Sequence, residues 1–265
     1  MVKSIEGRHP YPLYMSDVEA QKEAAGIAAC EVVKTGMNVG LGTGSTVKYT
    51  VIELGRRIAE EGLEIIGVPT SIATEKLALE VGIPLADLGD LQGLDVVIDG
   101  TDEFDGDFQL IKGGGGALLR EKIVAQASAS MIVVADGRKK VNTLGEFPLP
   151  IEITPFSWLE TKRQLSILFA TEGFIGDISL RRKKELGDVT CDGVEFPANE
   201  SGGVFVTDNG NVILDCHFGA SIVDPIGLET AILSKAGVAQ VGLFNNMCDA
   251  VYLADPAGVQ ILRKN

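Results

Sequence analysis

Short apolar segments alternate with helix-like segments over roughly the first half of the chain. The apolar segments have the length of buried strands and fall at residues 37–42, 64–70, 83–88, 94–100 and 131–136. Segments with helical spacing separate them, at residues 16–36, 45–62, 72–82 and 117–129. Because strands that are apolar throughout must be covered on both faces, the pattern predicts a doubly wound α/β domain with a mainly parallel, Rossmann-like sheet.

The order of elements changes after Phe147. The pattern there predicts a strand, helix, strand, hairpin, helix and strand, in turn at residues 148–154, 156–173, 178–183, 203–218, 225–237 and 238–244. This β-α-β-β-α-β order is typical of a small ferredoxin-like α+β domain. A further strand at 249–255, followed by a short helix, is expected to return to the first sheet. We therefore predict one domain from residues 1–147 with 245–265, and a smaller one from residues 148–244.

Three local features refine this outline. Ser16 and Glu19 have capping-box spacing at the start of the first helix, and Ser45 is placed to cap the second. We expect residues 1–15 to form an N-terminal extension. Residues 182–203, which are rich in charge and glycine, are expected to form a surface insertion.

Charge and cysteine content argue against several classes of protein. A formal net charge of −14 over 265 residues argues against a nucleic-acid or anionic-membrane partner, because both need a basic face. No apolar run reaches membrane-spanning length. The four cysteines are too scattered for a zinc site or a disulfide framework: Cys30, Cys191, Cys216 and Cys248. Scattered thiols suit a reducing compartment, so we expect a cytoplasmic protein.

The segment NVGLGTGSTV, residues 38–47, turns from a strand into a helix through alternate glycines. Glycines let a ligand approach the backbone, and the free N–H groups at a helix start attract an anion. Thr43, Ser45 and Thr46 add hydroxyl donors, so the segment could hold a phosphate. It lacks both the GK[ST] ending of a Walker loop and the third glycine of a dinucleotide fingerprint. A tight turn with hydroxyl caps and no ligand is the alternative.

Acidic residues gather in VVIDGTDEFDGD, residues 96–107, just after a buried strand. In open α/β sheets, ligands bind at that end of the strands. Asp99 and Asp102 flank a glycine turn, where both carboxylates could accept hydrogen bonds from sugar hydroxyls. The remaining acids do not fit the spacing of a calcium loop, and we expect them to be merely solvated: Glu103, Asp105 and Asp107.

The segment LIKGGGGALLREKI, residues 110–123, places four consecutive glycines between a strand and a helix. Glycines at 113–116 can adopt positive φ freely and build a concave array of N–H groups. Lys112 brings a cation to this array, and Glu121 follows on the first turns of the helix. Together these groups suit stabilisation of an oxyanion beside a proton-transferring base. The alternative is a glycine hinge before a helix whose charged residues, 120–122, are merely solvated.

These motifs occur together with two others, ADGRKKVNTLGEFPLPIEI and VTDNGNVILD. Combined with GLGTGST, DGTDE and KGGGGALLREK, they make the chain from about Asp17 to its C-terminus resemble ribose-5-phosphate isomerase of type A. The resemblance implies interconversion of D-ribose 5-phosphate and D-ribulose 5-phosphate, a step of the pentose phosphate pathway. It also implies no metal or organic cofactor, and a homodimer or homotetramer. Two positions depart from the family pattern: Thr101 stands where alanine is usual, and Leu119 where threonine is common.

The resemblance also implies roles for individual residues. Glu121 matches the proton acceptor, and the chemistry of the reaction suggests Lys112 as the oxyanion partner and Asp99 as a group that assists ring opening. Lys22, on the first helix, matches a basic residue near the site. The substrate-binding residues carried over by position are Thr43, Gly44, Ser45, Thr46, Asp99, Gly100, Thr101, Asp102, Lys112, Gly113, Gly114, Gly115 and Lys139.

Two other functions stay open from the sequence. A CoA transferase of similar α/β build would use a glutamate as nucleophile, although no segment resembles an adenine or pantetheine pocket. A non-catalytic sugar-phosphate sensor could use the same anion loop, but it would need no glutamate base. The two histidines, His9 and His217, offer no ligand cluster for a metal-assisted hydride shift, so an enediolate route is expected.

Overall fold

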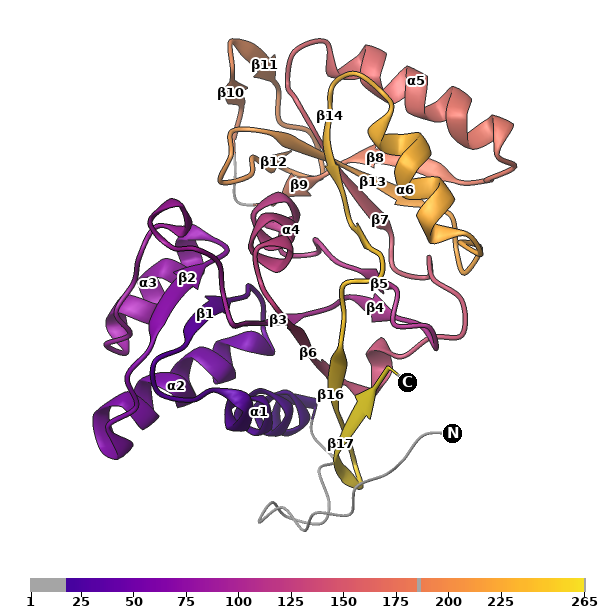
Figure 1. The fold of residues 1–265 in the computed structure, drawn as a ribbon. Coiled ribbons are helices and arrows are strands. Elements are labelled where there is room, and N and C mark those ends of the chain that lie inside the picture. Colours follow the sequence, from indigo (N-terminus) through magenta and orange to yellow (C-terminus); the bar gives the residue numbers. More distant parts are fainter. Residues whose placement is uncertain (1–17, 185–186, 265) are drawn as a thin grey trace.

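Six strands form the central sheet of the described part of the chain, residues 18–184 and 187–264 of a computed structural model (Figure 1). The sheet order is β17-β16-β6-β3-β1-β2, and neighbours are parallel apart from the β16–β17 pair. In that order the strands span Gly258–Arg263, Ala250–Asp255, Met131–Asp136, Val96–Gly100, Asn38–Leu41 and Ile66–Pro69. The predicted doubly wound, mainly parallel sheet is confirmed. The predicted N-terminal extension and the Ser16 cap lie outside the described residues.

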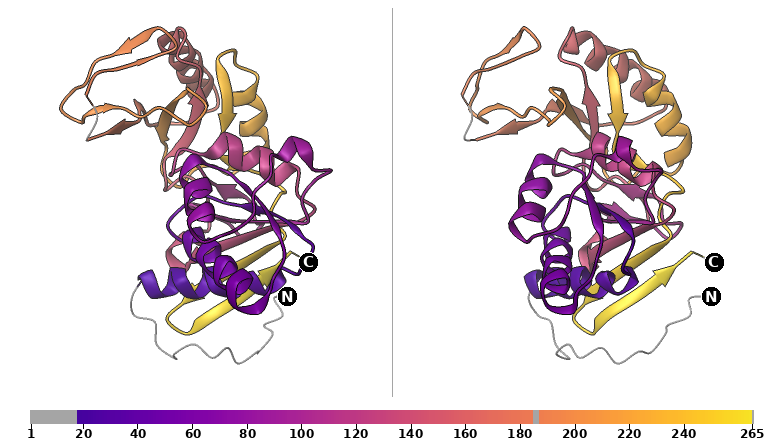
Figure 2. Two further views of the ribbon diagram at one scale, coloured as in Figure 1. Left: turned by 90° about the vertical axis from the view of Figure 1, so that its left-hand side faces the viewer. Right: turned by 60° about the vertical axis from the view of Figure 1, so that its left-hand side comes forward.

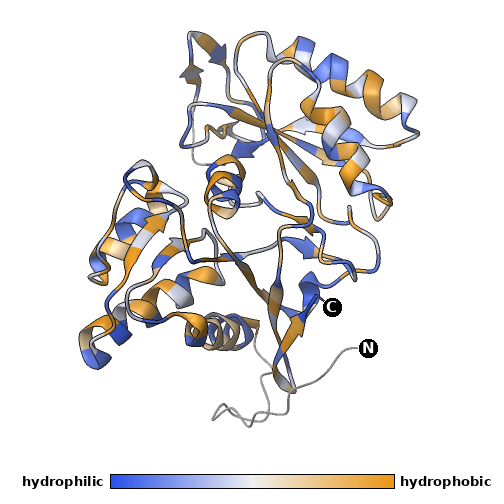
Figure 3. Ribbon diagram, in the orientation of Figure 1, coloured by the Kyte–Doolittle hydropathy of each residue, from blue (hydrophilic) through white to orange (hydrophobic). Residues whose placement is uncertain are grey.

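Helices cover both faces of this sheet, and each face has its own hydrophobic core. On one face lie α1 (Val18–Ala29) and α2 (Val47–Glu61), with α3 (Ile72–Glu80) beside α2. On the other face lies α4 (Leu118–Gln126). In Figure 3 strands β6 and β16 are mostly hydrophobic, whereas the helices mix hydrophobic and hydrophilic residues, as elements with one buried side do. None of the described helices is long and apolar enough to span a membrane.

A second, antiparallel sheet has the order β14-β7-β13-β8 and lies in the upper part of Figure 1. Its strands, in that order, span Val238–Val241, Leu149–Ile153, Val212–His217 and Asp177–Leu180. Helices α5 (Trp158–Thr171) and α6 (Pro225–Leu233) contact each other and pack on this sheet (Figure 2). The chain order β7-α5-β8-β13-α6-β14 is that of a ferredoxin-like domain, so the predicted smaller α+β domain is confirmed. The division of the chain at residues 147 and 244 stays a prediction, which the separate cores support.

A small third sheet connects the two larger ones, and the sequence pattern did not predict it. β4 (Glu103–Phe104) pairs with β5 (Leu110–Ile111), and β5 pairs with β15 (Leu243–Phe244). The pattern predicted one strand over residues 238–244, but the structure divides this segment between β14 and β15. The same run of backbone therefore belongs first to the four-stranded antiparallel sheet and then to this connecting sheet.

Gly242 forms the bend between β14 and β15. Its N–H donates to Pro150 O of β7 at 2.8 Å, and its carbonyl accepts the Lys112 N–H, also at 2.8 Å. One residue thus joins the small domain to the segment that carries Lys112. No side chain fits here, since a Cβ atom at position 242 would lie 2.2 Å from Lys112 O.

Two predicted elements are wrong. Residues 83–88 do not form a strand: Leu85 makes an isolated bridge to Gly67, and Pro84 has no N–H with which to extend a ladder. The short helix expected at the end of the chain is instead β17, which turns back onto β16 at Gly258, where φ is +128°. Glycine tolerates this conformation, so it favours a hairpin over a helix start.

The hairpin predicted at residues 203–218 forms only around its turn. Val206 bridges Val212, and Gly210 N–H closes the turn by donating to Thr207 O at 3.0 Å. Beyond this turn β12 pairs with β9, and β10 with β11; the bounds are Gly203–Val204, Arg182–Lys183, Val189–Cys191 and Val194–Phe196. That residues 182–203 are an insertion stays a prediction. Short 3-10 helices lie at Cys30–Val32, Leu88–Asp90 and Gly137–Lys139.

Replacing Gly242 with alanine should destabilise the fold. The added Cβ would lie 2.2 Å from Lys112 O and 2.9 Å from Pro150 Cδ, and overpacking of this kind costs about 1–3 kcal/mol. We expect a lower urea midpoint for Gly242→Ala, measured by circular dichroism. Gly106→Ala is the control, because a Cβ there meets no atom within 4 Å. Equal stabilities of the two variants would contradict a tight join at Gly242.

Candidate active site

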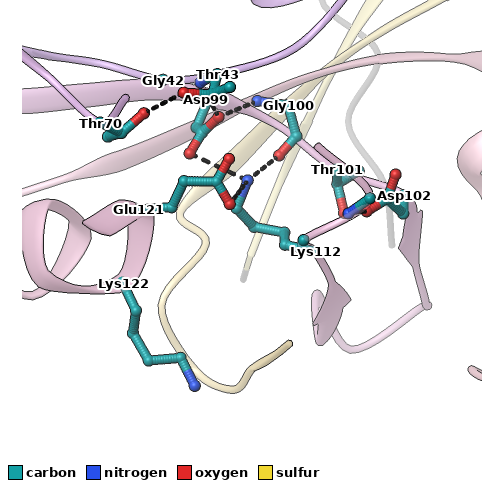
Figure 4. A network of polar contacts seen from close by, with 12 residues as sticks. Gly42, Thr43, Thr70, Asp99, Gly100, Thr101, Asp102, Lys112, Glu121 and Lys122 are labelled. Carbon is teal, nitrogen blue, oxygen red and sulfur yellow. Dashed lines mark hydrogen bonds and ion pairs between the residues drawn. The ribbon is translucent and has the colours of Figure 1, made fainter. Parts of the chain in front are cut away.

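The site lies where the strand order reverses. β1 pairs with β2 on one side and with β3 on the other. The carboxyl ends of strands at such a reversal are where open α/β sheets bind ligands. The loop after β1, residues 42–46, meets the end of β3 at this point (Figure 4). Gly42 allows the approach, since a Cβ at this position would lie 2.2 Å from Asp99 Oδ1.

Asp99 connects these two segments. Its Oδ1 accepts hydrogen bonds from Thr43 N–H at 3.1 Å and from Gly100 N–H at 2.7 Å, and its Oδ2 lies 3.0 Å from Lys112 Nζ. Burial raises the pKa of this carboxyl, while the Lys112 charge and the N–H donors oppose the increase. Asp99 lies beneath the cleft and does not line it. The geometry therefore favours an action through Lys112 and the backbone over direct contact with a ligand.

Lys112 is a buried cation between two carboxylates. Its Nζ lies 3.0 Å from Asp99 Oδ2 and 3.3 Å from Glu121 Oε2, and it donates to Gly100 O at 2.6 Å. Burial alone would lower the pKa of the lysine, but the two carboxylates outweigh burial and raise the pKa above its ordinary value. The Phe244 ring centroid, 5.3 Å from Nζ, adds a cation–π contact. Lys112 therefore stays positively charged in the site.

Glu121 lies in the first turn of α4 and points toward Lys112, whereas Lys122 on the same helix points away (Figure 4). The side chain is 3% exposed. Burial raises the pKa of Glu121 to about 8; the Asp99 carboxylate adds to the increase and Lys112 opposes it. Within the described residues, Glu121 Oε2 has no hydrogen-bond donor aligned with it, although Lys112 is near. A buried carboxylate with an available oxygen and a raised pKa is suited to accept a proton.

The glycine loop after Lys112 forms another wall of the site. Gly113 and Gly116 have positive φ angles of 108° and 82°, which suit glycine. Gly114 N–H donates to Asp102 Oδ2 at 2.7 Å, and a Cβ at Gly114 would lie 2.6 Å from the other carboxylate oxygen. Lys139 Nζ lies 4.0 Å from Asp102 Oδ1. Asp102 therefore holds the loop and places a second cation at the cleft.

These elements enclose a hollow of about 290 Å³. Its lining residues are Thr43, Gly44, Ser45, Thr46, Gly100, Thr101, Asp102, Lys112, Gly113, Gly114, Gly115, Glu121 and Lys139. Every predicted site residue except Asp99 and Lys22 thus lines this hollow. Asp99 lies beneath it, 3.0 Å from Lys112 Nζ, and Lys22 pairs with Glu19 at 2.7 Å. A larger hollow of about 530 Å³ between α3 and α4 has mostly aliphatic walls, and the buried Lys112 cluster is not part of it.

The start of α2 leaves backbone donors free. Thr46 precedes the helix without a side-chain cap, so the predicted Ser45 cap is wrong. Among the described residues, the N–H groups of Gly44, Ser45 and Thr46 have no hydrogen-bond acceptor. All three residues line the cleft. Free N–H groups at the N-terminus of a helix form an anion site.

Hydroxyl groups that the sequence pattern did not predict support this loop. Thr43 Oγ1 lies 2.7 Å from Thr70 Oγ1, 2.8 Å from Ser71 Oγ and 3.2 Å from Thr74 Oγ1. The Thr43 hydroxyl is therefore occupied within the protein, which leaves Ser45 and Thr46 as the hydroxyls open to a ligand. The sequence feature that could have predicted this support is the cluster of hydroxyl residues directly after β2, because it follows a strand at the same edge of the sheet.

Glu103, which we expected to be solvated, is buried, and so is Lys122, for which solvation was the alternative. Glu103 accepts hydrogen bonds from Gly145 N–H at 2.8 Å and Phe147 N–H at 2.5 Å. Lys122 is buried too, and its Nζ donates to Leu243 O at 2.6 Å. The prediction for Glu103 is wrong, and the alternative of a solvated Lys122 does not hold, because the partners of both residues lie far along the chain, where the spacing of charges carries no information.

Comparison with known proteins places the chain in a family. The family model described as ribose 5-phosphate isomerase A (phosphoriboisomerase A) matches residues 66–258. The chain belongs to the ribose-5-phosphate isomerase A family. The ribose-5-phosphate isomerase A of Parvibaculum lavamentivorans is 46% identical over 246 residues, covering 93% of this chain and 99% of that protein. That of Bacillus mycoides is 44% identical, covering 90% of this chain and 97% of that protein.

Solved structures of ribose-5-phosphate isomerases have the same fold. That of Methanocaldococcus jannaschii is 36% identical with a TM-score of 0.80, and covers 94% of this chain and 100% of its own. A D-ribose-5-phosphate isomerase in complex with phospho-erythronic acid is also 36% identical, with a TM-score of 0.82 over 94% of this chain and 100% of that one. The family membership predicted from the sequence motifs is confirmed.

The raised pKa of Glu121 predicts a pH-dependent effect of Glu121→Gln on stability. Below the ordinary value of 4.5 the carboxyl is protonated in both folded and unfolded chains. Between 4.5 and about 8 the unfolded chain releases this proton while the folded chain retains it, which progressively destabilises the wild type. The variant has no such proton to lose. Its free energy of unfolding, relative to that of the wild type, should therefore rise by up to about 1.4 kcal/mol per pH unit over this range.

Urea unfolding of both proteins at about pH 5, 6.5, 8 and 9 measures this difference. The gain should level off above about pH 8, where the folded wild type also ionises. A difference that stayed constant from pH 5 to pH 8 would contradict a raised pKa at Glu121.

Proposed function

We propose that this chain interconverts D-ribose 5-phosphate and D-ribulose 5-phosphate through an enediolate, with Glu121 as the base. The observation that carries the proposal is the placement of Glu121 and Lys112 in one cleft, 3.3 Å apart and buried. Membership of the ribose-5-phosphate isomerase A family supports the substrate. The related isomerase in complex with phospho-erythronic acid supports a site for a phosphorylated sugar chain.

The reaction moves one proton from C2 to C1 of the open-chain sugar. The Glu121 carboxylate takes the C2 proton, the C–H electron pair forms the C1–C2 double bond, and the C1 carbonyl oxygen becomes an oxyanion. Glu121 then returns the proton to C1. As the double bond opens, O2 loses its proton and becomes the ketone oxygen, while O1 gains a proton and becomes a hydroxyl. A pKa raised to about 8 makes Glu121 a stronger base than an ordinary carboxylate.

Lys112 stabilises the negative charge of the intermediate. The charge develops on O1 and O2, and Lys112 Nζ is a fixed cation close to the base. Gly115 lines the same cleft, and its N–H has no acceptor among the described residues. Preorganised donors of this kind stabilise a developing negative charge most strongly where water is excluded. Both Lys112 and Glu121 are almost fully buried, so the site meets that condition.

The 5-phosphate binds at the start of α2. Gly44, Ser45 and Thr46 offer free N–H groups, and the last two add hydroxyls. The 15-residue helix behind them directs the positive end of its dipole at the cleft. Lys139 lines the cleft as a further cation for the phosphate or the sugar.

The remaining predicted residues shape the substrate site. Asp102 orients the glycine loop and can accept a hydrogen bond from a sugar hydroxyl. The Thr101 hydroxyl lies 2.6 Å from Glu103 O and 2.9 Å from Ile111 O, so it is bound to the protein backbone. The threonine at this position thus adds no free hydroxyl to the cleft. Asp99 orients Lys112 and would influence ring opening through it.

Turnover without a metal or organic cofactor stays a prediction, as do a homodimer or homotetramer and a cytoplasmic location. An isomerase assay with ribose 5-phosphate, before and after treatment with a chelator, tests the activity and its metal dependence together. Failure of the purified protein to form ribulose 5-phosphate would refute the proposed function.

Glu121→Gln should abolish most of the activity while the fold survives. The amide keeps the shape of the side chain but cannot accept the proton, so kcat should fall by ~10²–10⁴ or more. Isomerisation by the wild type in heavy water should place deuterium in the product, because a carboxylate proton exchanges with solvent between abstraction and return. Full activity of Glu121→Gln would rule out this base. Metal-dependent turnover with no deuterium in the product would rule out the enediolate.

Ser45→Glu should weaken binding of phosphorylated sugars. The new carboxylate would repel the phosphate at the start of α2, so we expect KM for ribose 5-phosphate to rise by about tenfold or more. Ser45 is exposed and its hydroxyl has no partner among the described residues, so the melting temperature should not change. Ser45→Ala is the matched control and should have a small effect. An unchanged KM in Ser45→Glu would mean that the phosphate binds elsewhere.

A further inference from the structure

Arg181 reaches from the small domain to the glycine loop of the cleft. Its Nη1 donates to Gly113 O at 2.6 Å and to Gly114 O at 3.2 Å. Its Nε donates to Asp215 Oδ2 at 2.9 Å, and its Nη2 donates to Asp215 Oδ1. The Arg181 side chain is 12% exposed. A carboxylate that binds two guanidinium nitrogens fixes the plane of the group, so Asp215 aims Nη1 at the loop.

Peptide geometry converts this contact into an orientation of N–H groups. In a planar trans peptide the C=O and the following N–H point in opposite directions. With Gly113 O held by Arg181, Gly114 N–H points away from the arginine and reaches Asp102 Oδ2 at 2.7 Å. With Gly114 O held as well, Gly115 N–H also points away from the arginine. Gly115 lines the cleft, and its N–H has no acceptor among the described residues.

The loop needs such a constraint because glycine peptides flip easily. Glycine populates positive and negative φ about equally, so consecutive glycines have several loop conformations of similar energy. A flipped peptide between Gly114 and Gly115 would present its carbonyl to the cleft and repel a developing oxyanion. Arg181 opposes the flip with a charged donor on the outer side of the loop.

We propose that Arg181 is a positioning residue that keeps Gly115 N–H directed into the cleft, where it donates to the sugar oxygen that becomes negative. The inference rests on the isomerase function proposed above. Arg181 itself does not line the cleft. Its effect on the reaction passes through the two peptide units that it binds.

Arg181→Ala and Arg182→Ala form a matched pair for the test. Arg182 is the next residue, and its Nη1 donates to Pro197 O at 3.1 Å and Gly202 O at 3.0 Å, away from the glycine loop. We expect kcat of Arg181→Ala to fall by about 10–100-fold with a smaller change in KM, because the lost donor acts mainly on the charged intermediate. Arg182→Ala should stay within about twofold of the wild type.

Rescue by free guanidinium separates positioning from stability. Guanidinium chloride at about 10–50 mM, far below denaturing concentrations, should restore part of kcat in Arg181→Ala. It should not raise the activity of Arg182→Ala or the wild type, and sodium chloride at the same concentration should have no effect. A fall in kcat that guanidinium does not restore would assign Arg181 a structural role only.

If Arg181→Ala does not fold, Asp215→Asn replaces it in the test. This variant keeps the arginine but removes the charge that aims it, so kcat should fall by about three- to tenfold with KM little changed. A wild-type kcat in either folded variant would overturn the positioning role. Absence of isomerase activity in the wild type would instead refute the function on which the inference rests.

Discussion

Two carboxylates share one ammonium group in the buried part of the cleft, and the chemistry of the site follows from that imbalance. Burial favours the neutral form of both Asp99 and Glu121, and the single charge of Lys112 can balance only one of them. Asp99 has two backbone N–H donors in addition, from Thr43 and Gly100, which favour its ionised form. The pair therefore retains a proton more readily than two ordinary carboxyls would, and Glu121, which lines the cleft, is the member placed to exchange a proton with a ligand.

Glycines around this cluster make room for carboxylates to reach the backbone. The Asp99 carboxylate occupies the space beside Gly42, and the Asp102 carboxylate occupies the space beside Gly114. At both positions a methyl group would displace the acid that orders the loop. The run of glycines is therefore more than a flexible hinge: it lets one acidic side chain and one backbone segment lie in direct contact, with N–H groups left over for a ligand.

The sequence predicted the parts of this molecule that depend on neighbouring residues and missed those that depend on distant ones. Apolar strands and the loops after them follow from local pattern, and those loops hold the residues that line the cleft. Residues 83–88 show where this local reasoning fails. Their hydrophobicity predicted a strand, but Pro84 has no N–H with which to extend the ladder. Lys122, Glu103 and Arg181 show a second failure: each is ordered by backbone groups far along the chain, and charge alone cannot distinguish them from solvated residues.

The backbone that bends at Gly242 belongs to two sheets at once. If β14 left the four-stranded sheet, Gly242 would move with it, and Lys112 N–H would lose its acceptor, the Gly242 carbonyl. The Lys122 ammonium would also lose the carbonyls of Val241 and Leu243. An unpaired buried N–H and an uncompensated buried charge are both strongly unfavourable. Separate melting of the small domain would therefore expose both defects, and we expect the two domains to unfold as a single cooperative unit, so that catalytic geometry and global structure are lost together.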